Sequence, residues 1–330
     1  MILSRDTIVA KSDPPFQITP AILALAGEIE RLVGRAEGLD ANAPQPLLRK
    51  RNRVRTVRSS VAIEGNTLTE EQVTALLAGK RVAGSRREIL EVTNANAAYE
   101  RAADFTPSRE RDLLAAHRIM MAGLVERAGR FRSSNVGVLH GTKVAHVAPP
   151  ASRVPGLVRK LLAWMKRGTS PPLVRSCVAH YELLFIHPFV DGNGRMARLW
   201  QHVSLLEGSA LFAVVPVESV IRERQATYYE VLGACDHAGE STLFIAFILE
   251  AMRDALAESL PQLRPVRPTP ATRLESSRNA LGRRWFTRGA YLALHQTIAT
   301  ATASRDLAQG IADGVLESRG ERRLTEYRFR

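Results

Sequence analysis

The stretch that decides the fold of its surroundings is His187-Pro188-Phe189-Val190-Asp191-Gly192-Asn193-Gly194-Arg195-Met196-Ala197-Arg198. A residue that precedes proline is pushed out of the α region, which predicts an extended conformation for His187. Gly192 and Gly194 allow a sharp turn with outward-facing N–H groups, a geometry suited to an anion. Residues 195–207 have helical spacing, so the loop should open onto a helix N-terminus, with both arginines on one face. The stretch therefore predicts a site for a polyphosphate beside a proton acceptor.

The same glycines allow a second interpretation. Residues 192–197 fit G-x-G-x-x-A, a dinucleotide-binding fingerprint, and Glu218 lies roughly where its ribose-binding acid would be expected. However, Pro216 interrupts the strand that this fold requires, and no alternating strands and helices surround the motif. This interpretation also leaves the histidine, the aspartate and both arginines without a role. A plain helix cap with surface arginines accounts for the glycines alone.

The composition is that of a basic chain with few cysteines. Its 330 residues contain 46 Lys+Arg against 33 Asp+Glu, a formal net charge of +13, which favours acidic partners such as nucleotides or nucleic acid. The length predicts two or three domains, and 45% hydrophobic residues supply an ample core. With Cys177 and Cys235 alone, a reducing compartment is expected. Residues 1–20 lack a signal-peptide core and residues 243–249 are too short to span a bilayer, so we expect a soluble, cytoplasmic protein.

Apolar residues recur at helical spacing along most of the chain, which predicts a mainly α fold. The expected helices are 19–38, 47–63, 68–77, 86–102, 108–126, 152–167, 173–185, 195–207, 218–233 and 241–258. Valines and a leucine around Gly137 and Gly141 predict a β-hairpin over 135–147. The charged run 49–55 is typical of a solvated helix face, and equally of a surface that meets a nucleotide or an acid.

At every defined position, residues 187–198 match H-P-F-x-D-G-N-G-R-x-x-R, and the chain therefore resembles the Fic family. Members are mostly helical and typically transfer AMP from ATP to a Ser, Thr or Tyr hydroxyl of a protein. The resemblance implies that His187 is the general base, that Asp191 binds Mg²⁺ and that Phe189 anchors the loop. The implied phosphate-binding residues are Gly192, Asn193, Gly194, Arg195 and Arg198. Histidine, with an ordinary pKa near ~6.5, can accept a proton at neutral pH, and Mg²⁺ needs only one or two carboxylates besides the phosphates.

Ser60-Val61-Ala62-Ile63-Glu64-Gly65 matches the [S/T]-x-x-x-E-[G/N] inhibitory motif of many Fic proteins. Ser60 and Glu64 lie four residues apart on one helix face, and Gly65 supplies a stop. A glutamate against Arg198 would form a charge pair and remove the partner of the γ-phosphate. The resemblance thus implies autoinhibition by Glu64, although a surface glutamate at a helix end would fit the spacing alone.

Three further features extend the resemblance or stand beside it. The hairpin corresponds to the flap on which relatives dock their target by strand addition, and Gly129-Arg130-Phe131-Arg132 before it follows the family pattern. Tyr229 resembles a residue near the nucleotide, although a core aromatic pair with Tyr228 is at least as plausible. His180 has no third ligand at a supporting spacing, so we expect a packed helix histidine rather than a metal ligand.

The C-terminal part of the chain has a composition of its own. Residues 261–330 hold 13 Arg and 6 Asp+Glu, and four prolines within 261–270 predict an extended linker. Helices at 287–293 and 304–314, followed by strand, turn and strand over 315–329, predict a winged helix-turn-helix. Its candidate phosphate contacts are Thr302, Ser304, Arg305, Arg322 and Arg323. DNA and a protein partner are about equally compatible with this fold.

Together these features predict four segments: a helical segment 1–105 with the inhibitory motif, a Fic core 106–258, a linker 259–281 and a winged helix 282–330. The expected function is protein adenylylation with ATP and Mg²⁺, restrained by Glu64. Two alternatives stay open: removal of AMP with help from Glu64, and a DNA-binding regulator that senses nucleotide. The expected partners are ATP and a protein target on the hairpin, with self-modification, DNA and a homo-oligomer left open and no membrane.

Overall fold

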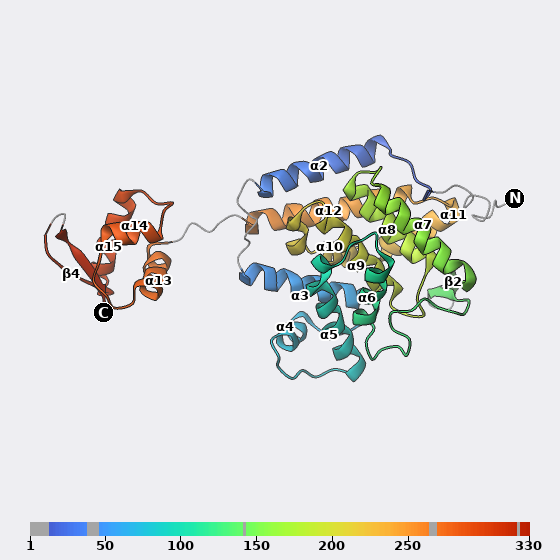
Figure 1. Ribbon diagram of the computed structural model, residues 1–330, viewed down its shortest axis with the longest axis horizontal. Helices are drawn as coiled ribbons and strands as arrows, with labels where there is room; N and C mark the ends of the chain where they lie inside the picture. Colours follow the sequence, from blue (N-terminus) through green and yellow to red (C-terminus); the bar gives the residue numbers. More distant parts are fainter. Residues whose placement is uncertain (1–12, 38–45, 141–142, 264–268, 322–323) are drawn as a thin grey trace. The chain divides into compact units, whose positions relative to one another are not determined.

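The computed structural model describes residues 13–37, 46–140, 143–263, 269–321 and 324–330. The chain divides into two compact units, Met1–Pro265 and Val266–Arg330. Both are built mainly from helices, as Figure 1 shows, and the mainly α fold class expected from the sequence is confirmed. No helix among the described residues is long and apolar enough to cross a membrane.

The larger unit is assembled around two helices that pack against each other, α8 (Pro172–Ile186) and α9 (Asn193–Leu206). Most residues of both are buried, Trp200 completely, because their apolar side chains cover most of the circumference. Beside them runs the long helix α12, which packs against α2 along one side of the unit (Figure 1). The bounds of these and the neighbouring helices are α2 (Pro20–Glu37), α10 (Val217–Glu223), α11 (Gln225–Ala238) and α12 (Thr242–Leu263).

A second group of helices packs on α8 and α9 or on one another. It comprises α3 (Pro46–Ile63), α4 (Glu70–Leu77), α5 (Arg86–Glu100), α6 (Glu110–Met120) and α7 (Val154–Arg167), with short 3-10 turns η1 (Ala102–Asp104), η2 (Ala151–Arg153) and η3 (Ala210–Val214). Helices α4 and α5 begin at capping boxes on Thr69 and Ser85, which satisfy N–H groups that the helix itself leaves unpaired. Helix α3 packs against α4, α5 and α10, so its C-terminal end is held near α9.

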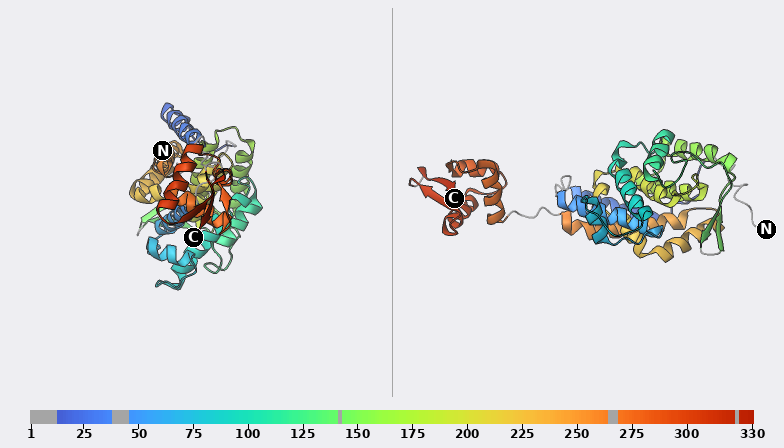
Figure 2. Two further views of the ribbon diagram at one scale, coloured as in Figure 1. Left: turned by 90° about the vertical axis from the view of Figure 1, so that its left-hand side faces the viewer. Right: turned by 90° about the horizontal axis from the view of Figure 1, so that it is seen from below.

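The predicted hairpin is present. Strands β1 (Gly137–His140) and β2 (Lys143–Val147) pair antiparallel, with Gly137 opposite Val147. The hairpin lies beside α11, at the edge of the unit (Figure 2).

Several of the predicted helices have different bounds. The helix expected over 241–258 runs from Thr242 to Leu263, and the helix expected over 304–314 runs from Thr300 to Ala312. The helix expected over 108–126 ends at Met120, and Gly123, with φ of 69°, turns the chain just beyond it. The helix expected over 218–233 is two helices that meet at Arg224, whose guanidinium pairs with Asp254 at 2.6 Å. The break at Arg224 is a feature that helical spacing does not encode.

The smaller unit combines three helices with a three-stranded sheet. Its elements are α13 (Pro270–Leu281), β3 (Phe286–Thr287), α14 (Arg288–Leu294), α15 (Thr300–Ala312), β4 (Leu316–Arg319) and β5 (Glu326–Phe329). The sheet order is β3-β5-β4 and both pairings are antiparallel. Its core is closed by a buried ion pair in which Arg273 donates to Asp306 at 2.6 Å, with the Tyr291 hydroxyl donating to the same carboxylate.

The predicted linker 259–281 is wrong at both ends. Helix α12 continues to Leu263, with Pro261 in its last turns, where a proline removes a single helical hydrogen bond. Helix α13 begins at Pro270, and the Thr269 side chain caps it by accepting from the Thr272 N–H at 3.2 Å. A proline in the first turn needs no N–H partner, so proline content alone overestimated the linker. Residues 264–268, like Arg322 and Arg323, lie outside the described residues.

Candidate functional site

His187 ends helix α8 in a left-handed conformation, with φ of 50° and ψ of 59°. The extended conformation predicted for it is therefore wrong. Pro188 excludes the right-handed α region but not the left-handed one, and the left-handed turn lets the His187 N–H donate to the Leu183 carbonyl at 3.1 Å. His187 is the only non-glycine residue with positive φ among those described. Such strain persists only where the surroundings impose it, and it concentrates at functional sites.

Arg132 imposes this turn. Its side chain is 3% exposed, and its Nε donates to the His187 carbonyl at 2.7 Å. Its own N–H donates to the Pro188 carbonyl at 2.9 Å. The guanidinium also reaches the carbonyls of Ser134 and Pro149, at the two ends of the hairpin. One buried arginine thus ties the backbone of His187 to the hairpin.

The signature loop, residues 187–194, is closed by a reciprocal contact. The Asn193 amide accepts from the Phe189 N–H and donates to the Phe189 carbonyl, both at 2.9 Å. Asn193 is 4% exposed, so its side chain fixes the loop from within the protein. The Phe189 ring is completely buried and stacks on His117, with the ring centroids 3.7 Å apart.

His117 holds the next turn of the loop. Its Nδ1 accepts from the Gly129 N–H at 2.8 Å, which leaves the proton on Nε2 to donate to the Asp191 carbonyl at 3.1 Å. Burial lowers the pKa of His117 to about 4, so the ring is neutral near pH 7. The neutral ring is suited to this role because it donates on one side and accepts on the other.

The Asp191 carboxylate is partly exposed and already faces cations. Its Oδ1 accepts from the Gly192 N–H at 2.6 Å and from Arg195 at 3.2 Å, and its Oδ2 accepts from Arg87 at 3.0 Å. Asp191 is 39% exposed and Arg87 is 58% exposed, so Arg87 can leave. One such carboxylate, together with phosphate oxygens, is a donor set that Mg²⁺ accepts. No group of three potential metal ligands occurs in the described part of the chain.

Arg195 and Arg198 follow on the first turns of α9, where free N–H groups also favour phosphate. Arg195 is 3% exposed and lies 3.4 Å from Glu91 and 3.2 Å from Asp191. Arg198 is 1% exposed and donates through Nε and Nη2 to the hydroxyl and carbonyl of Ser60, at 3.2 and 2.8 Å. Both arginines are thus pre-oriented by acidic or polar partners.

Glu64 lies directly on Arg198. Its Oε1 accepts from Arg198 Nη2 at 2.7 Å. Burial is the largest influence and would lower the pKa of Arg198, but the Glu64 carboxylate together with Tyr228 and Tyr99 outweighs burial and raises it. A Cβ at Gly194 would overlap Glu64 Oε1, so the carboxylate reaches the arginine only because residue 194 has no side chain.

The end of α3 that carries Glu64 is held from two sides. Gly65, with φ of 94°, stops the helix, and Asn66 donates to the Glu88 carbonyl and to Glu91 at 3.1 and 3.0 Å. From α11, the Tyr229 hydroxyl and the Gln225 amide donate to the Ile63 carbonyl at 3.3 and 3.1 Å. Tyr229 therefore contacts the end of α3 that carries Glu64.

Glu218 lies behind Ser60 and has no part in a dinucleotide site. It is 3% exposed on helix α10, and it accepts from the Tyr99 hydroxyl at 2.9 Å. Burial raises the pKa of Glu218 to about 7. Residues 192–197 are preceded by helix α8 rather than a strand, so the dinucleotide interpretation is wrong. His180 is a packed helix histidine, as expected, since its ring nitrogens meet Gln201 and Tyr228 at 2.5 and 3.0 Å.

The structure adds four side chains to the site that were not assigned from the sequence: Arg87, Glu91, His117 and Arg132. Of these, only Arg132 had a sequence signal, through the G-R-F-R pattern before the hairpin. The others belong to helices α5 and α6, and Arg87 is separated from Asp191 by 104 positions. Amphipathic spacing places them on a helix face but does not say what they face.

Residues 106–205 match the model of the Fic/DOC family. The chain is 43% identical to a Fic family protein from Desulfovibrio desulfuricans G20 of known structure, with a TM-score of 0.76 and coverage of 96% of this chain and 98% of that one. The chain belongs to the Fic family.

Among curated proteins, it is similar to the protein adenylyltransferase fic-1 of Caenorhabditis elegans, with 33% identity over 205 residues, 58% of this chain and 38% of that protein. It also resembles the protein adenylyltransferase Fic of Drosophila melanogaster, with 29% identity over 227 residues, 63% and 43% of the two chains. The chain thus spans about two fifths of the length of these relatives.

Proposed function

We propose that this protein is a protein adenylyltransferase that moves AMP from ATP to a Ser, Thr or Tyr hydroxyl and is restrained by Glu64. The observation that carries the proposal is the complete signature loop, with a strained His187 at its start and Arg198 bound to Glu64 at its end. The similarity to named adenylyltransferases supports the same activity.

In the proposed reaction, the target hydroxyl oxygen bonds to the α-phosphorus and the bond from that phosphorus to the bridging oxygen breaks, so pyrophosphate leaves. His187 takes the hydroxyl proton. The backbone of residues 192–194 and the two arginines bind the phosphate oxygens, on which negative charge gathers. Mg²⁺ on Asp191 would neutralise charge on the phosphates when bound. Asn193 acts by positioning, because both polar groups of its amide are bonded to Phe189.

The restraint follows from the geometry of one guanidinium. While Arg198 donates to Glu64, it is not available to an outer phosphate, and the Glu64 carboxylate repels that phosphate. ATP bound without this partner has its leaving group misplaced for in-line attack, and small misplacements cost large factors in rate.

We propose further that the edge of the hairpin receives the target segment. An exposed strand edge pairs with an extended peptide through main-chain hydrogen bonds, which demands little of the target sequence. Arg132 supports this assignment because it joins the hairpin ends to the backbone of His187.

The test is transfer of label from ATP carrying ³²P on the α-phosphate. Glu64→Ala should label protein more strongly than the wild type, and Glu64→Ala/His187→Ala should not label at all. Glu126→Ala, which removes an exposed glutamate, is the matched control and should behave as the wild type. Equal labelling with and without His187 would overturn the proposed chemistry.

A second candidate activity, removal of AMP, is favoured by the accessibility of Glu64. Its side chain is 30% exposed, which leaves room for a water molecule at the second carboxylate oxygen. If labelled protein loses AMP with Glu64 intact and keeps it in Glu64→Ala, removal is the main activity. If both release label equally slowly, Glu64 only restrains.

For the C-terminal unit we propose nucleic-acid contact through helix α15, whose Arg305 is exposed in the middle of the helix. Thr302 and Ser304 are half-buried on the same helix, and Ser304 accepts from Arg288 at 3.0 Å. Duplex DNA binding should weaken steeply with salt and with Arg305→Ala. Binding unchanged by Arg305→Ala would dispose of this role.

A further inference from the structure

A small cavity lies between α9 and α10, beside the buried side chain of Arg198. Its volume is about 10 Å³, and one water molecule needs roughly 10–15 Å³ of such space. All the residues that line it are buried. Its polar walls include Gln201 from α9 and Glu218 from α10, each 3% exposed. The cavity therefore suits one small polar molecule and nothing larger.

Gln201 supplies a hydrogen-bond donor to this cavity. Its Oε1 lies 2.5 Å from His180 Nδ1, and an amide oxygen only accepts, so the His180 proton is on Nδ1. His180 Nε2 then accepts from the Tyr228 hydroxyl at 3.0 Å. This orientation leaves Gln201 Nε2 for the cavity, where it is buried and has no hydrogen-bond partner among the described residues. A buried donor left in this way is costly.

Glu218 supplies the complementary acceptor. Its Oε1 accepts from the Tyr99 hydroxyl at 2.9 Å, whereas its buried Oε2 has no hydrogen-bond partner within the described part of the chain. A water molecule accepts from an amide N–H and donates to a carboxylate oxygen at the same time. Because water also accepts, it satisfies this oxygen equally when the carboxyl is protonated. One water between Gln201 and Glu218 therefore meets both needs.

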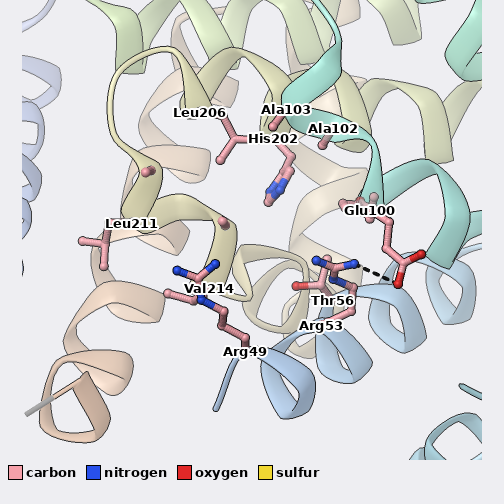
Figure 3. A pocket seen from close by; sticks show the side chains of 13 residues that line it. Arg49, Arg53, Thr56, Glu100, Ala102, Ala103, His202, Leu206, Leu211 and Val214 are labelled. Atoms are coloured by element: carbon pink, nitrogen blue, oxygen red, sulfur yellow. Dashed lines mark ion pairs between the residues drawn. The ribbon is translucent and has the colours of Figure 1, made fainter. Parts of the chain in front are cut away.

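Water has a route to the cavity from the surface. His202 lines this cavity and also a larger one of about 340 Å³ on the outer side of α9, where Figure 3 shows its ring. The exposed residues Ala103 and Ala213 line the larger cavity, so it meets the solvent. A movement of the His202 side chain is then enough to let one water molecule pass.

A water at this position would close a ring of polar contacts around Arg198. Arg198 lines the cavity and precedes Gln201 by three residues on the same face of α9. On its other side, Arg198 Nε donates to Ser60 Oγ at 3.2 Å. The Tyr99 hydroxyl lies 3.5 Å from this Oγ and donates to Glu218. The gap in the ring is the one between Glu218 and Gln201.

We propose that this cavity binds one water molecule, which accepts from Gln201 Nε2 and donates to Glu218 Oε2, and that the water helps to hold Arg198 in place for the outer phosphates of ATP. A bridging water is nearly as favourable as a direct hydrogen bond, so it joins α9 to α10 behind the arginine. Gln201 is a positioning residue that acts through Arg198. The role toward ATP rests on the proposed function, whereas the binding of water does not.

The binding is tested by a high-resolution crystal structure of the full chain, which should show one water within hydrogen-bond distance of Gln201 Nε2 and Glu218 Oε2. Magnetic relaxation dispersion of ¹⁷O-labelled water checks it in solution, because it counts water molecules held inside the protein. It should find one fewer in Val217→Ile, which adds a methyl group to the cavity wall. Val220→Ile is the matched control, since Val220 is equally buried on the same helix but lies outside the cavity. A cavity without water density, or equal counts in all three proteins, overturns the proposal.

The role toward ATP is tested by calorimetric titration in the Glu64→Ala background. Gln201→Met removes the donor at similar length, so ATP should bind several-fold more weakly while AMP, which lacks the outer phosphates, binds unchanged. Asn52→Leu, which removes a buried amide outside the cavity, should change neither affinity. Equal losses for ATP and AMP in Gln201→Met overturn the positioning role. If no variant binds ATP, the proposed function fails, but the crystal structure and the ¹⁷O count still decide whether the cavity holds water.

Discussion

The signature loop and the end of α3 that carries Glu64 meet at Arg198 but are fixed in different ways. The backbone of the loop is held at successive turns by Arg132, Asn193 and His117, each buried. Glu64 is held on Arg198 by one carboxylate oxygen and remains partly exposed. The difference teaches that the loop is fixed by several buried contacts, whereas the contact between Glu64 and Arg198 is a single, partly exposed one whose loss should leave the loop in place.

The largest effect should come from the loop itself. Asn193→Ala removes both hydrogen bonds to Phe189, so in the Glu64→Ala background labelling should fall by about 100-fold because the phosphate-binding backbone loses its geometry. Initial rates of ³²P transfer measure this, with circular dichroism to verify the helical fold. A rate within threefold of the parent would mean that the loop does not need this anchor.

The free energy of unfolding should depend on pH through Glu218, which is buried behind Ser60. Glu218 has a pKa near 7 in the folded protein against an ordinary 4.5, so its contribution to the free energy of unfolding falls as pH rises from 4.5 to about 7 and is level above. Glu218→Gln should remove this loss and gain on the order of 2 kcal/mol over the wild type between pH 5 and 8. Urea unfolding of the wild type and of Glu218→Gln at pH 5 and at pH 8 measures this gain. A difference in stability between the two proteins that does not grow with pH contradicts the prediction.

Gly194→Ala tests whether Glu64 truly occupies the space above Gly194. In the wild type the new Cβ meets Glu64 Oε1, so the free energy of unfolding should fall by about 1–2 kcal/mol. In Glu64→Ala the nearest obstacle is gone, Arg198 Nη1 remains 3.3 Å from the new Cβ, and alanine favours the helix, so the same change should be neutral or stabilising by up to ~1 kcal/mol. The double-mutant cycle gives the coupling. Additive effects would place the Glu64 carboxylate elsewhere.

The smallest effect concerns Arg87, an exposed partner of Asp191. If this guanidinium competes with Mg²⁺ for the carboxylate, Arg87→Gln should lower the half-saturating Mg²⁺ concentration of Glu64→Ala a few-fold, as expected for an exposed ion pair. Arg86→Gln, the neighbouring exposed arginine, is the control. An unchanged or higher Mg²⁺ requirement for Arg87→Gln would remove Arg87 from the site.

Much of this arrangement follows from local sequence. Helical spacing predicted α2, α3, α7 and α9 to within two residues at either end, and the hairpin was predicted from valines and glycines. The prediction that Glu64 contacts Arg198 came from the resemblance to the family rather than from spacing, and the structure has a hydrogen bond between the two side chains. Spacing alone fitted a surface glutamate equally well.

What sequence reasoning could not supply depends on long-range packing. The rule for residues before proline excludes one region for His187, but the choice of the left-handed turn comes from the Leu183 carbonyl and Arg132. Asn193 was expected at the α-phosphate, yet its amide is bonded to Phe189, a contact that needs the closed loop. The proline-rich segment was read as linker because composition does not distinguish a first-turn proline from an extended one.

The central claim is that Glu64 withholds Arg198 from the outer phosphates in an otherwise complete site. Calorimetric affinities of ATP and AMP for the wild type and Glu64→Ala test it without any protein target. Removing Glu64 should tighten ATP binding about tenfold or more and leave AMP, which lacks the outer phosphates, unchanged. Unchanged ATP affinity, or an equal gain for both nucleotides, would contradict the claim.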